Sequence, residues 1–326
     1  MKILFVSSGN TKDGLSPIIK NQGQSLIEQG AAVDFFTIKG RGLKSYVSHI
    51  FILRNYLRTN KYDIIHAHYG LCGLIALFAK GCDIKLIISF MGTDLLGEYS
   101  KDGKATLSGK IRVFINKIFA RCYDYVIVKS HEMGNKIPID NKSVIPNGID
   151  ITKFSPFDKQ QSLTIVGWDQ NSRHVLFLSS PDRPVKNFRL ADTAFRNLQI
   201  DGVQLHILKD IPNNDLVYFY NASDVCLLTS FHEGSPNTIK EAMACNRSII
   251  STDVGDVSLI FGDTEGCFIS DFDPIILAKT ISIALDFSLT KGSTNGRERI
   301  IELGLDSETI AKRLLALYSK VLYSEP

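Results

Sequence analysis

Two glutamates eight positions apart, Glu233 and Glu241, are the residues of this sequence best suited to act on a polar substrate. They lie within Ser230–Cys245, between the apolar runs Val225–Leu228 and Ile249–Ile250. Apolar runs of this length are typical of strands that are buried on both faces of a parallel sheet, so the stretch between them predicts a loop and a helix. Eight residues make about two helical turns, which places one carboxylate just before the helix and the other along it.

The residues that follow Glu233 favour a helix start that binds an anion. Gly234 permits a sharp turn, Ser235 is the predicted N-cap, and Pro236 suits the first helical position. Asn237 and Thr238 add side-chain hydrogen-bonding groups beside the free backbone N–H groups of the first turn. The stretch therefore predicts a pocket for a ligand that carries a phosphate and many hydroxyl groups.

A pair of cations, Arg183 and Lys186, follows the predicted strand His174–Leu178. A guanidinium and an ammonium group near a helix start suit a diphosphate, although such a pair is also common in solvated turns. Because the carboxyl ends of parallel strands lie at one edge of a sheet, we expect this loop and the Glu233 loop to converge.

Three residues of the first half are candidates for the opposite side of a binding cleft. His68 lies just beyond the predicted strand Asp63–His66, Asp94 follows the predicted strand Lys85–Phe90, and Gly14 lies in the loop after the first strand. A structural role for His68 and Asp94 is an equally open interpretation. The sequence contains neither G-x-G-x-x-G after the first strand nor G-x-x-x-x-G-K-[ST], which argues against a dinucleotide-dependent oxidoreductase and a P-loop NTPase.

The sequence predicts no metal and no cofactor. Asp271 and Asp273 form a D-x-D triplet, but Pro274 and an apolar helix follow, so Asp273 is predicted to be an N-cap. The six cysteines form no C-x-x-C pair, and we expect buried reduced thiols, as in a cytoplasmic protein. The first apolar run is too short for a secretory signal, and none reaches the ~20 residues of a membrane span.

Alternating strands and helices in both halves predict an α/β fold with two doubly wound, Rossmann-like domains. The turn Pro146–Asp150 marks the end of the first alternation. We expect an N-terminal domain over residues 1–155 and a C-terminal domain over 156–305. We also expect a final helix over 306–326 that crosses back to the first domain.

Charge is distributed unevenly between the halves. Residues 1–155 carry a net charge of +9 and residues 156–326 a net charge of −6. Two basic helices, over 43–61 and 104–121, interleave cations with aromatic and aliphatic residues. This pattern favours a peripheral position on an anionic membrane surface, with ordinary solvated helix faces as the alternative. The basic excess is too small, and stacking motifs too few, to indicate nucleic-acid binding.

Five motifs together resemble glycosyltransferase family 4. They are Glu233-x7-Glu241, the inter-domain turn Ile145–Asp150, Arg183–Asn187, Asp63–His68 and Gly92–Asp94, and they span almost the whole chain in the family's order. The resemblance implies the GT-B fold, in which two such domains face each other across a cleft. It also implies transfer of a sugar from a nucleotide-sugar donor with retention and without a metal. The resemblance makes the N-terminal domain, 1–155, the acceptor-binding domain and the C-terminal domain, 156–305, the nucleotide-sugar-binding domain.

The resemblance further implies roles for the candidate residues. Glu233 would hold hydroxyl groups of the donor sugar, and Glu241 would bind the ribose hydroxyls. Arg183 and Lys186 would stabilise charge on the departing diphosphate, while the start of the helix, over 234–238, would meet the sugar and the diphosphate. The chain departs from the family at Met91, where a histidine is common, at Asn246–Ser248, and at Asp256, which replaces a glycine.

The sequence therefore predicts a cytoplasmic glycosyltransferase, peripheral on the inner face of a membrane, that builds a surface polysaccharide. Its partners would be a UDP- or GDP-sugar and a glycan or lipid-linked acceptor, and not a nucleic acid. Two alternatives remain open: a nucleotide-sugar epimerase on the same fold, and a non-catalytic sugar-binding protein.

Overall fold

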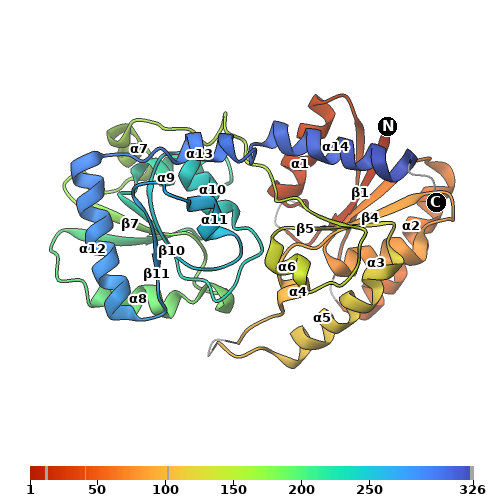
Figure 1. Ribbon diagram of the computed structural model, residues 1–326, viewed down its shortest axis with the longest axis horizontal. Coiled ribbons are helices and arrows are strands. Elements are labelled where there is room, and N and C mark those ends of the chain that lie inside the picture. The colour runs from red at the N-terminus through yellow and green to blue at the C-terminus, as the bar shows by residue number, and fades with distance from the viewer. Residues whose placement is uncertain (12–13, 41, 101–102, 324–326) are drawn as a thin grey trace. The chain divides into compact units, whose positions relative to one another are not determined.

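The computed structural model describes residues 1–11, 14–40, 42–100 and 103–323, with only the backbone of residues 43–44. These residues form two compact units (Figure 1). Unit 1 consists of Met1–Gly97, Leu107–Gly148 and the C-terminal segment that begins at Ser307. Unit 2 consists of Glu98–Thr106 and Ile149–Asp306. Residues 324–326, at the end of the expected final helix, lie outside the described residues.

Unit 1 is built on a six-stranded parallel sheet with the order β2-β1-β3-β4-β5-β6. Its strands are β1 (Lys2–Ser8), β2 (Ala32–Ile38), β3 (Ile64–His68), β4 (Lys85–Ser89), β5 (Tyr125–Val128) and β6 (Lys142–Val144). Its helices are α1 (Pro17–Glu28), α2 (Leu43–Thr59), α3 (Gly70–Ala79), α4 (Thr93–Leu96), α5 (Leu107–Phe119), η1 (Ala120–Cys122), α6 (His131–Asn135) and α14 (Ser307–Tyr323).

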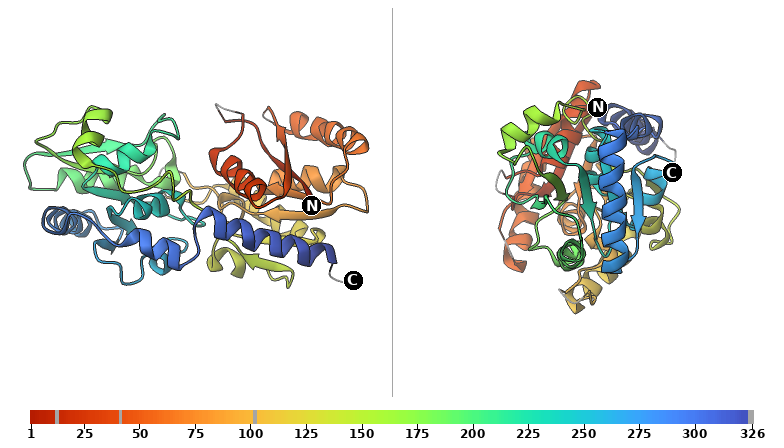
Figure 2. Two further views of the ribbon diagram at one scale, coloured as in Figure 1. Left: turned by 90° about the horizontal axis from the view of Figure 1, so that it is seen from above. Right: turned by 90° about the vertical axis from the view of Figure 1, so that its left-hand side faces the viewer.

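The two faces of this sheet are covered by different helices. Alternate residues of a strand point to opposite faces, so Ile3 and Phe5 of β1 pack with α1 and α14, whereas Leu4 and Val6 pack with α2 and α3. Figure 2 shows α14 lying along the sheet of unit 1. The last helix of the chain is thus part of the core of the first unit.

Unit 2 is built on a five-stranded parallel sheet with the order β11-β10-β9-β7-β8. Its strands are β7 (Arg173–Phe177), β8 (Val203–Ile207), β9 (Val225–Leu228), β10 (Ser248–Thr252) and β11 (Cys267–Ser270). Its helices are α7 (Lys159–Val166), η2 (Pro184–Lys186), α8 (Phe188–Arg196), α9 (Leu216–Ala222), α10 (Asn237–Ala244), α11 (Val257–Phe261), α12 (Pro274–Lys291) and α13 (Gly296–Glu302). Helices α8 and α12 cover one face, and α9, α10, α11 and α13 cover the other.

The boundary between the units lies earlier than the sequence predicted. Residues 149–155 were expected to belong to the first domain, but Ile149 and Phe154 are buried in the core of unit 2. The backbone N–H of Ile149 also donates to the carbonyl oxygen of Leu305, which ties both ends of unit 2 together. The turn at Pro146–Asp150 therefore contains the boundary, and the segment after it is already part of the second core.

Candidate active site

Lys186 and Glu233 form an ion pair at the carboxyl-terminal edge of the unit 2 sheet. The Lys186 Nζ lies 2.6 Å from Glu233 Oε1, and the Ser230 hydroxyl donates to the same oxygen at 2.6 Å. Strands β7 and β9 are adjacent, so the loops that follow them meet, and the Phe231 N–H donates to the Val185 carbonyl at 2.9 Å. The structure thus brings together the two loops that the sequence singled out.

The pair holds Glu233 in its charged form. Burial by itself would raise the pKa of Glu233, but the Lys186 ammonium, its hydrogen bond, the Ser230 hydroxyl and the Arg183 guanidinium together lower the pKa below its ordinary value. Lys186 is 6% exposed, whereas Arg183 is exposed to solvent. Arg183 therefore adds charge to the site without being locked into it.

The start of α10 presents polar atoms that the protein leaves unused. Ser235 Oγ, Asn237 Oδ1 and Thr238 Oγ1 are buried and have no hydrogen-bond partner among the described residues. Because a buried polar atom without a partner costs about 1–3 kcal/mol, such a group marks a place where a ligand can supply the bond.

The predicted N-cap is wrong by one residue. Helix α10 begins at Asn237, and Pro236, not Ser235, is the N-cap, with an extended ψ of 115°. Gly234 is buried immediately before this turn. The shift leaves the Ser235 hydroxyl outside the helix, where it does not cap the backbone.

Glu241, on α10, is buried, and a tyrosine of α9 holds its carboxylate. The Tyr220 hydroxyl donates to Glu241 Oε2 at 2.6 Å. Burial raises the pKa of Glu241, and the Tyr220 hydrogen bond and the charges of Lys240 and Lys153 offset only part of this rise. The carboxylate is thus oriented by α9 before any ligand arrives.

Lys240 and Asp256 add a second pair of opposite charges near the Glu233 loop. Lys240 is fully buried, and its burial lowers its pKa to about 8 in spite of the nearby carboxylates of Asp256 and Glu241. Burial likewise raises the pKa of Asp256. Gly255, at φ +64°, packs so closely that a Cβ there would lie 2.7 Å from the Gly234 carbonyl oxygen. The β10–α11 loop therefore supports the backbone of the Glu233 loop from behind.

In unit 1, the carboxylate of Asp94 is hydrogen-bonded to backbone N–H groups. Its carboxylate accepts hydrogen bonds from the N–H groups of Gly92 at 2.9 Å, Met91 at 3.0 Å and Gly70 at 3.2 Å. Burial nevertheless raises the pKa of this carboxyl group. Met91, the departure from the family pattern, is thus anchored through its backbone by Asp94.

His68 is placed at the end of β3 and is 1% exposed. Neither of its ring nitrogens has a hydrogen-bond partner among the described residues, so it is not hydrogen-bonded to Asp94. Burial, followed by the Lys129 charge, lowers the pKa of His68 well below its usual value, so the ring is neutral. Gly14 adopts φ +74° and donates its N–H to the Thr11 carbonyl oxygen at 3.0 Å.

Two family models match the chain, one over each half. The model described as Glycosyltransferase Family 4 matches residues 14–153, and the model described as Glycosyl transferases group 1 matches residues 159–286. The chain belongs to glycosyltransferase family 4. The family predicted from the five motifs is confirmed, and with it the class of the protein, a transferase enzyme.

Curated relatives of this glycosyltransferase include enzymes of polysaccharide synthesis. The putative teichuronic acid biosynthesis glycosyltransferase TuaC of Bacillus subtilis (strain 168) is 25% identical, over 68% of this chain and 60% of the relative. The UDP-Gal:α-D-GlcNAc-diphosphoundecaprenol α-1,3-galactosyltransferase of Escherichia coli is 26% identical, over 80% of this chain and 75% of the relative. The match to TuaC thus spans less than two thirds of that relative's length.

Solved structures confirm the predicted GT-B fold. Sucrose-phosphate synthase from Thermosynechococcus elongatus superposes with a TM-score of 0.79 at 18% identity, covering 100% of both chains. Anabaena HepE in complex with UDP-glucose superposes with a TM-score of 0.76 at 16% identity, covering 98% of this chain and 100% of that one. At these identities the structural similarity shows the fold of the glycosyltransferase but does not identify its substrate.

Two residues of the candidate site were missed at the level of sequence. Tyr220, on α9, carries no motif and is brought to Glu241 only by the packing of α9 against α10. Lys240 carried a signal, because a lysine between Ile239 and the run Ala242–Met243–Ala244 interrupts the apolar face of a buried helix.

The D-x-D triplet of the glycosyltransferase behaves as predicted for a helix cap. Asp273 is the N-cap of α12, and its carboxylate accepts from the N–H groups of Ile275 and Ile276 at 2.8 and 2.9 Å. Among the described residues, no group of three or more His, Cys, Asp or Glu side chains is placed to hold a metal ion.

Proposed function

We propose that this enzyme transfers a sugar from a nucleotide-sugar donor, a UDP- or GDP-sugar, to a glycan or lipid-linked acceptor. Transfer proceeds with retention at the reacting carbon and without a metal ion. The observation that supports this most is the Lys186–Glu233 pair beside three buried side-chain oxygens that lack a protein partner. A charged carboxylate, a buried cation and unused hydrogen-bonding atoms match a ligand with hydroxyl groups and a diphosphate.

Each residue of the site has a distinct role in the proposed reaction. Glu233 accepts hydrogen bonds from hydroxyl groups of the donor sugar, and the N–H groups that open α10 face the diphosphate. Lys186 has three N–H donors, so it can hold Glu233 and a phosphate oxygen together. As the bond to the sugar breaks, Lys186 and the exposed Arg183 stabilise the charge that develops on the leaving diphosphate.

Glu241 orients the nucleotide in this proposal. A carboxylate offers about four acceptor positions, so the bond from Tyr220 leaves capacity for the ribose hydroxyls. Because Tyr220 fixes the carboxylate beforehand, little conformational entropy is lost when the ribose binds.

The names of two relatives support the class of acceptor. The E. coli relative is named for UDP-Gal as donor and for an acceptor linked to diphosphoundecaprenol, and the B. subtilis relative for teichuronic acid biosynthesis. We propose that this chain likewise extends a surface polysaccharide, and that it does so at the inner face of a membrane.

A screen of UDP-, GDP- and ADP-sugars for thermal stabilisation tests the donor. We expect a UDP- or GDP-sugar to raise the unfolding temperature equally with and without EDTA. Loss of the shift in EDTA would contradict metal independence, and the absence of a shift with every donor would contradict the proposal. NMR of the donor after incubation without acceptor separates a transferase from an epimerase, because an epimerase would invert a sugar hydroxyl under these conditions.

A membrane position is supported by one face of unit 1. Helices α2, α3 and α5 cover the same side of the sheet, and none of them contains an Asp or Glu residue. Helix α5 exposes the apolar side chains of Leu107, Ile111, Phe114 and Ile118, each more than half exposed. Lys110, Lys117 and Arg121 are exposed beside them.

This face combines the two attractions that bind a peripheral protein to an anionic leaflet. Phe114 and Ile118 line a hollow of about 650 Å³ that also contains Lys117, Arg121 and Lys136. Each cation near an anionic leaflet contributes about 1 kcal/mol, and each apolar side chain adds its own burial. Among the described residues, no helix has the length and hydropathy needed to cross a bilayer.

Vesicle flotation tests the membrane position. We expect the protein to float with phosphatidylcholine vesicles that contain phosphatidylglycerol and to remain behind with pure phosphatidylcholine. The double variant Phe114→Ser with Ile118→Ser should lose roughly tenfold or more in binding. Ile275→Ser with Leu289→Ser, on exposed positions of α12, is the matched control. Equal flotation of both double variants would overturn the assignment of this face.

A further inference from the structure

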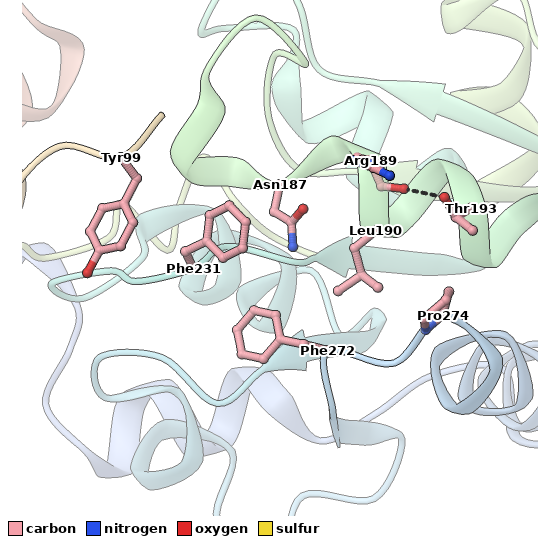
Figure 3. A pocket seen from close by; sticks show the side chains of 8 residues that line it. All are labelled: Tyr99, Asn187, Arg189, Leu190, Thr193, Phe231, Phe272 and Pro274. Atoms are coloured by element: carbon pink, nitrogen blue, oxygen red, sulfur yellow. Dashed lines mark hydrogen bonds between the residues drawn. The ribbon is translucent and has the colours of Figure 1, made fainter. Parts of the chain in front are cut away.

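Three aromatic rings from three separate segments stand in a row on unit 2 (Figure 3). The rings of Tyr99 and Phe231 have centroids 6.2 Å apart and planes 20° apart, and those of Phe231 and Phe272 are 6.0 Å and 14° apart. Tyr99 belongs to the short segment Glu98–Thr106 that is part of unit 2, Phe231 follows β9, and Phe272 follows β11. Nearly parallel rings brought together from distant parts of the chain form one continuous apolar platform.

The platform is open rather than packed into a core. Phe272 is 50% exposed, and the three rings line a pocket of about 510 Å³. The neighbouring Asp273 already fulfils the local structural need as the N-cap of α12, so the exposed ring has no role in starting that helix. A large aromatic side chain held at a pocket mouth is typical of a ligand site.

The remaining wall of the pocket supplies a few polar groups. Asn187, Arg189 and Thr193 line it, and Figure 3 shows the Asn187 amide directed into the space between Phe231 and Leu190. An amide, a guanidinium and a hydroxyl beside an apolar platform can orient a polar ligand by hydrogen bonds.

This combination fits a sugar ring. A pyranose presents C–H groups on its flat faces, which stack on aromatic rings, and hydroxyl groups around its rim, which hydrogen-bond to polar side chains. A nucleoside diphosphate fits less well, because Arg189 is the one cation among the described lining residues. The volume lies within the range of about 300–1,000 Å³ that is usual for small-molecule sites.

The chain connects this pocket to the proposed reaction site. Phe231 stands two positions before Glu233, and Asn187 directly follows Lys186. The pocket nevertheless uses a different set of side chains from the Lys186–Glu233 pair. We propose that Tyr99, Phe231 and Phe272 form a subsite for a sugar ring of the acceptor glycan other than the ring that receives the new bond. This inference rests on the proposed transferase function.

Ligand-observed NMR with defined oligosaccharides tests the subsite. The probes are malto-, cello- and chito-oligosaccharides of one to four sugar rings, titrated against the full chain, and UDP is titrated separately. We expect at least one series to bind in about the millimolar range, with affinity that increases with chain length. Phe272→Ala and Tyr99→Ala should each weaken this binding roughly tenfold and leave the affinity for UDP unchanged.

Phe157→Ala is the matched control. Phe157 is 42% exposed on the same unit and packs against Tyr218, away from the platform. Its variant should bind the oligosaccharides as the wild type does. Failure of every series to bind the wild type, or equal binding by Phe272→Ala, would overturn the subsite. A loss of UDP affinity in Phe272→Ala would instead indicate a nucleobase platform and also overturn it.

The outcomes separate the subsite from the function on which it rests. Stabilisation by a nucleotide sugar without any oligosaccharide binding would reject the subsite and leave the transferase proposal intact. Oligosaccharide binding that depends on Phe272, without a response to any nucleotide sugar, would reject the transferase proposal and identify a sugar-binding protein.

Discussion

Asp94 and Glu233 are both acidic residues that follow a strand at the carboxyl-terminal edge of a parallel sheet, Asp94 in the short helix α4 and Glu233 in a loop, but their surroundings differ. Asp94, in unit 1, accepts hydrogen bonds from three backbone N–H groups. Glu233, in unit 2, is held by two side chains, Lys186 and Ser230. Burial raises the pKa of Asp94, whereas the pKa of Glu233 is lowered because Lys186, Ser230 and Arg183 together outweigh burial.

The difference separates a carboxylate that shapes a loop from one that is available to a ligand. Backbone N–H groups have no alternative partner once the chain has folded, so the Asp94 carboxylate stays hydrogen-bonded to them. Side-chain donors can shift by a bond rotation, so Lys186 and Ser230 can share Glu233 with a substrate. Unpartnered oxygens accompany Glu233, namely those of Ser235, Asn237 and Thr238.

Replacing Glu233 by Gln should give the largest effect. The amide keeps the shape but removes the charge, so kcat should fall roughly 10²–10³-fold if the carboxylate acts on the reacting sugar. Glu302→Gln, at an exposed position of α13, is the matched control for the chemical change. Transfer rates are compared at saturating donor. Wild-type activity in the Glu233 variant would reject its catalytic role.

The second largest effect is expected from replacing Lys240, and it concerns how the free energy of unfolding depends on pH. Its folded pKa of about 8 lies below the ordinary value of 10.5, so between these values the unfolded chain binds more protons than the folded chain. The stability of the wild type should therefore rise between about pH 8 and 10 relative to Lys240→Met, by about 1–3 kcal/mol. Urea unfolding at a series of pH values measures this difference. A pH-independent difference would mean that Lys240 keeps an ordinary pKa.

Much of the fold could be predicted because local patterns dictate it. Buried runs such as Ile3–Val6 and Val225–Leu228 are apolar throughout, which indicates parallel strands, and the helices between them have clear apolar stripes. Helix α7 was missed because its apolar residues form no regular stripe; only the Asp158 N-cap, whose side chain accepts from the Gln161 N–H, marks its start.

The meeting of the two loops at one edge of the unit 2 sheet was predictable from the sequence, but the side-chain pairings were not. The Lys186–Glu233 contact joins positions 47 residues apart and depends on β7 lying next to β9 although β8 comes between them in the chain. The start of α10 was misplaced because Pro236 suits both the N-cap and the first helical position, and only the extended ψ decides between them. Asn246, in one of the departures from the family pattern, adopts φ +54° in the left-handed region.

Asp94→Asn is expected to act on stability rather than on the reaction. The variant keeps one acceptor oxygen but turns an amide NH₂ group toward backbone donors, which should cost about 2 kcal/mol in the free energy of unfolding. Chemical denaturation measures the loss. The thermal shift on nucleotide-sugar binding should stay unchanged, and a selective loss of activity without destabilisation would erase the distinction between the two carboxylates.

Asp273 extends the comparison into unit 2, because it is a backbone-held carboxylate in the unit that contains Glu233. If it serves only as the N-cap of α12, Asp273→Asn should be nearly neutral, since Asn caps as well as Asp, while Asp273→Ala should cost about 1 kcal/mol of stability. Both variants should retain wild-type kcat. A metal role predicts instead that both variants lose kcat, because neither Asn nor Ala supplies the charge that a divalent ion requires. The kcat of Asp273→Asn relative to the wild type, measured with and without EDTA, therefore decides between the cap and a metal ligand.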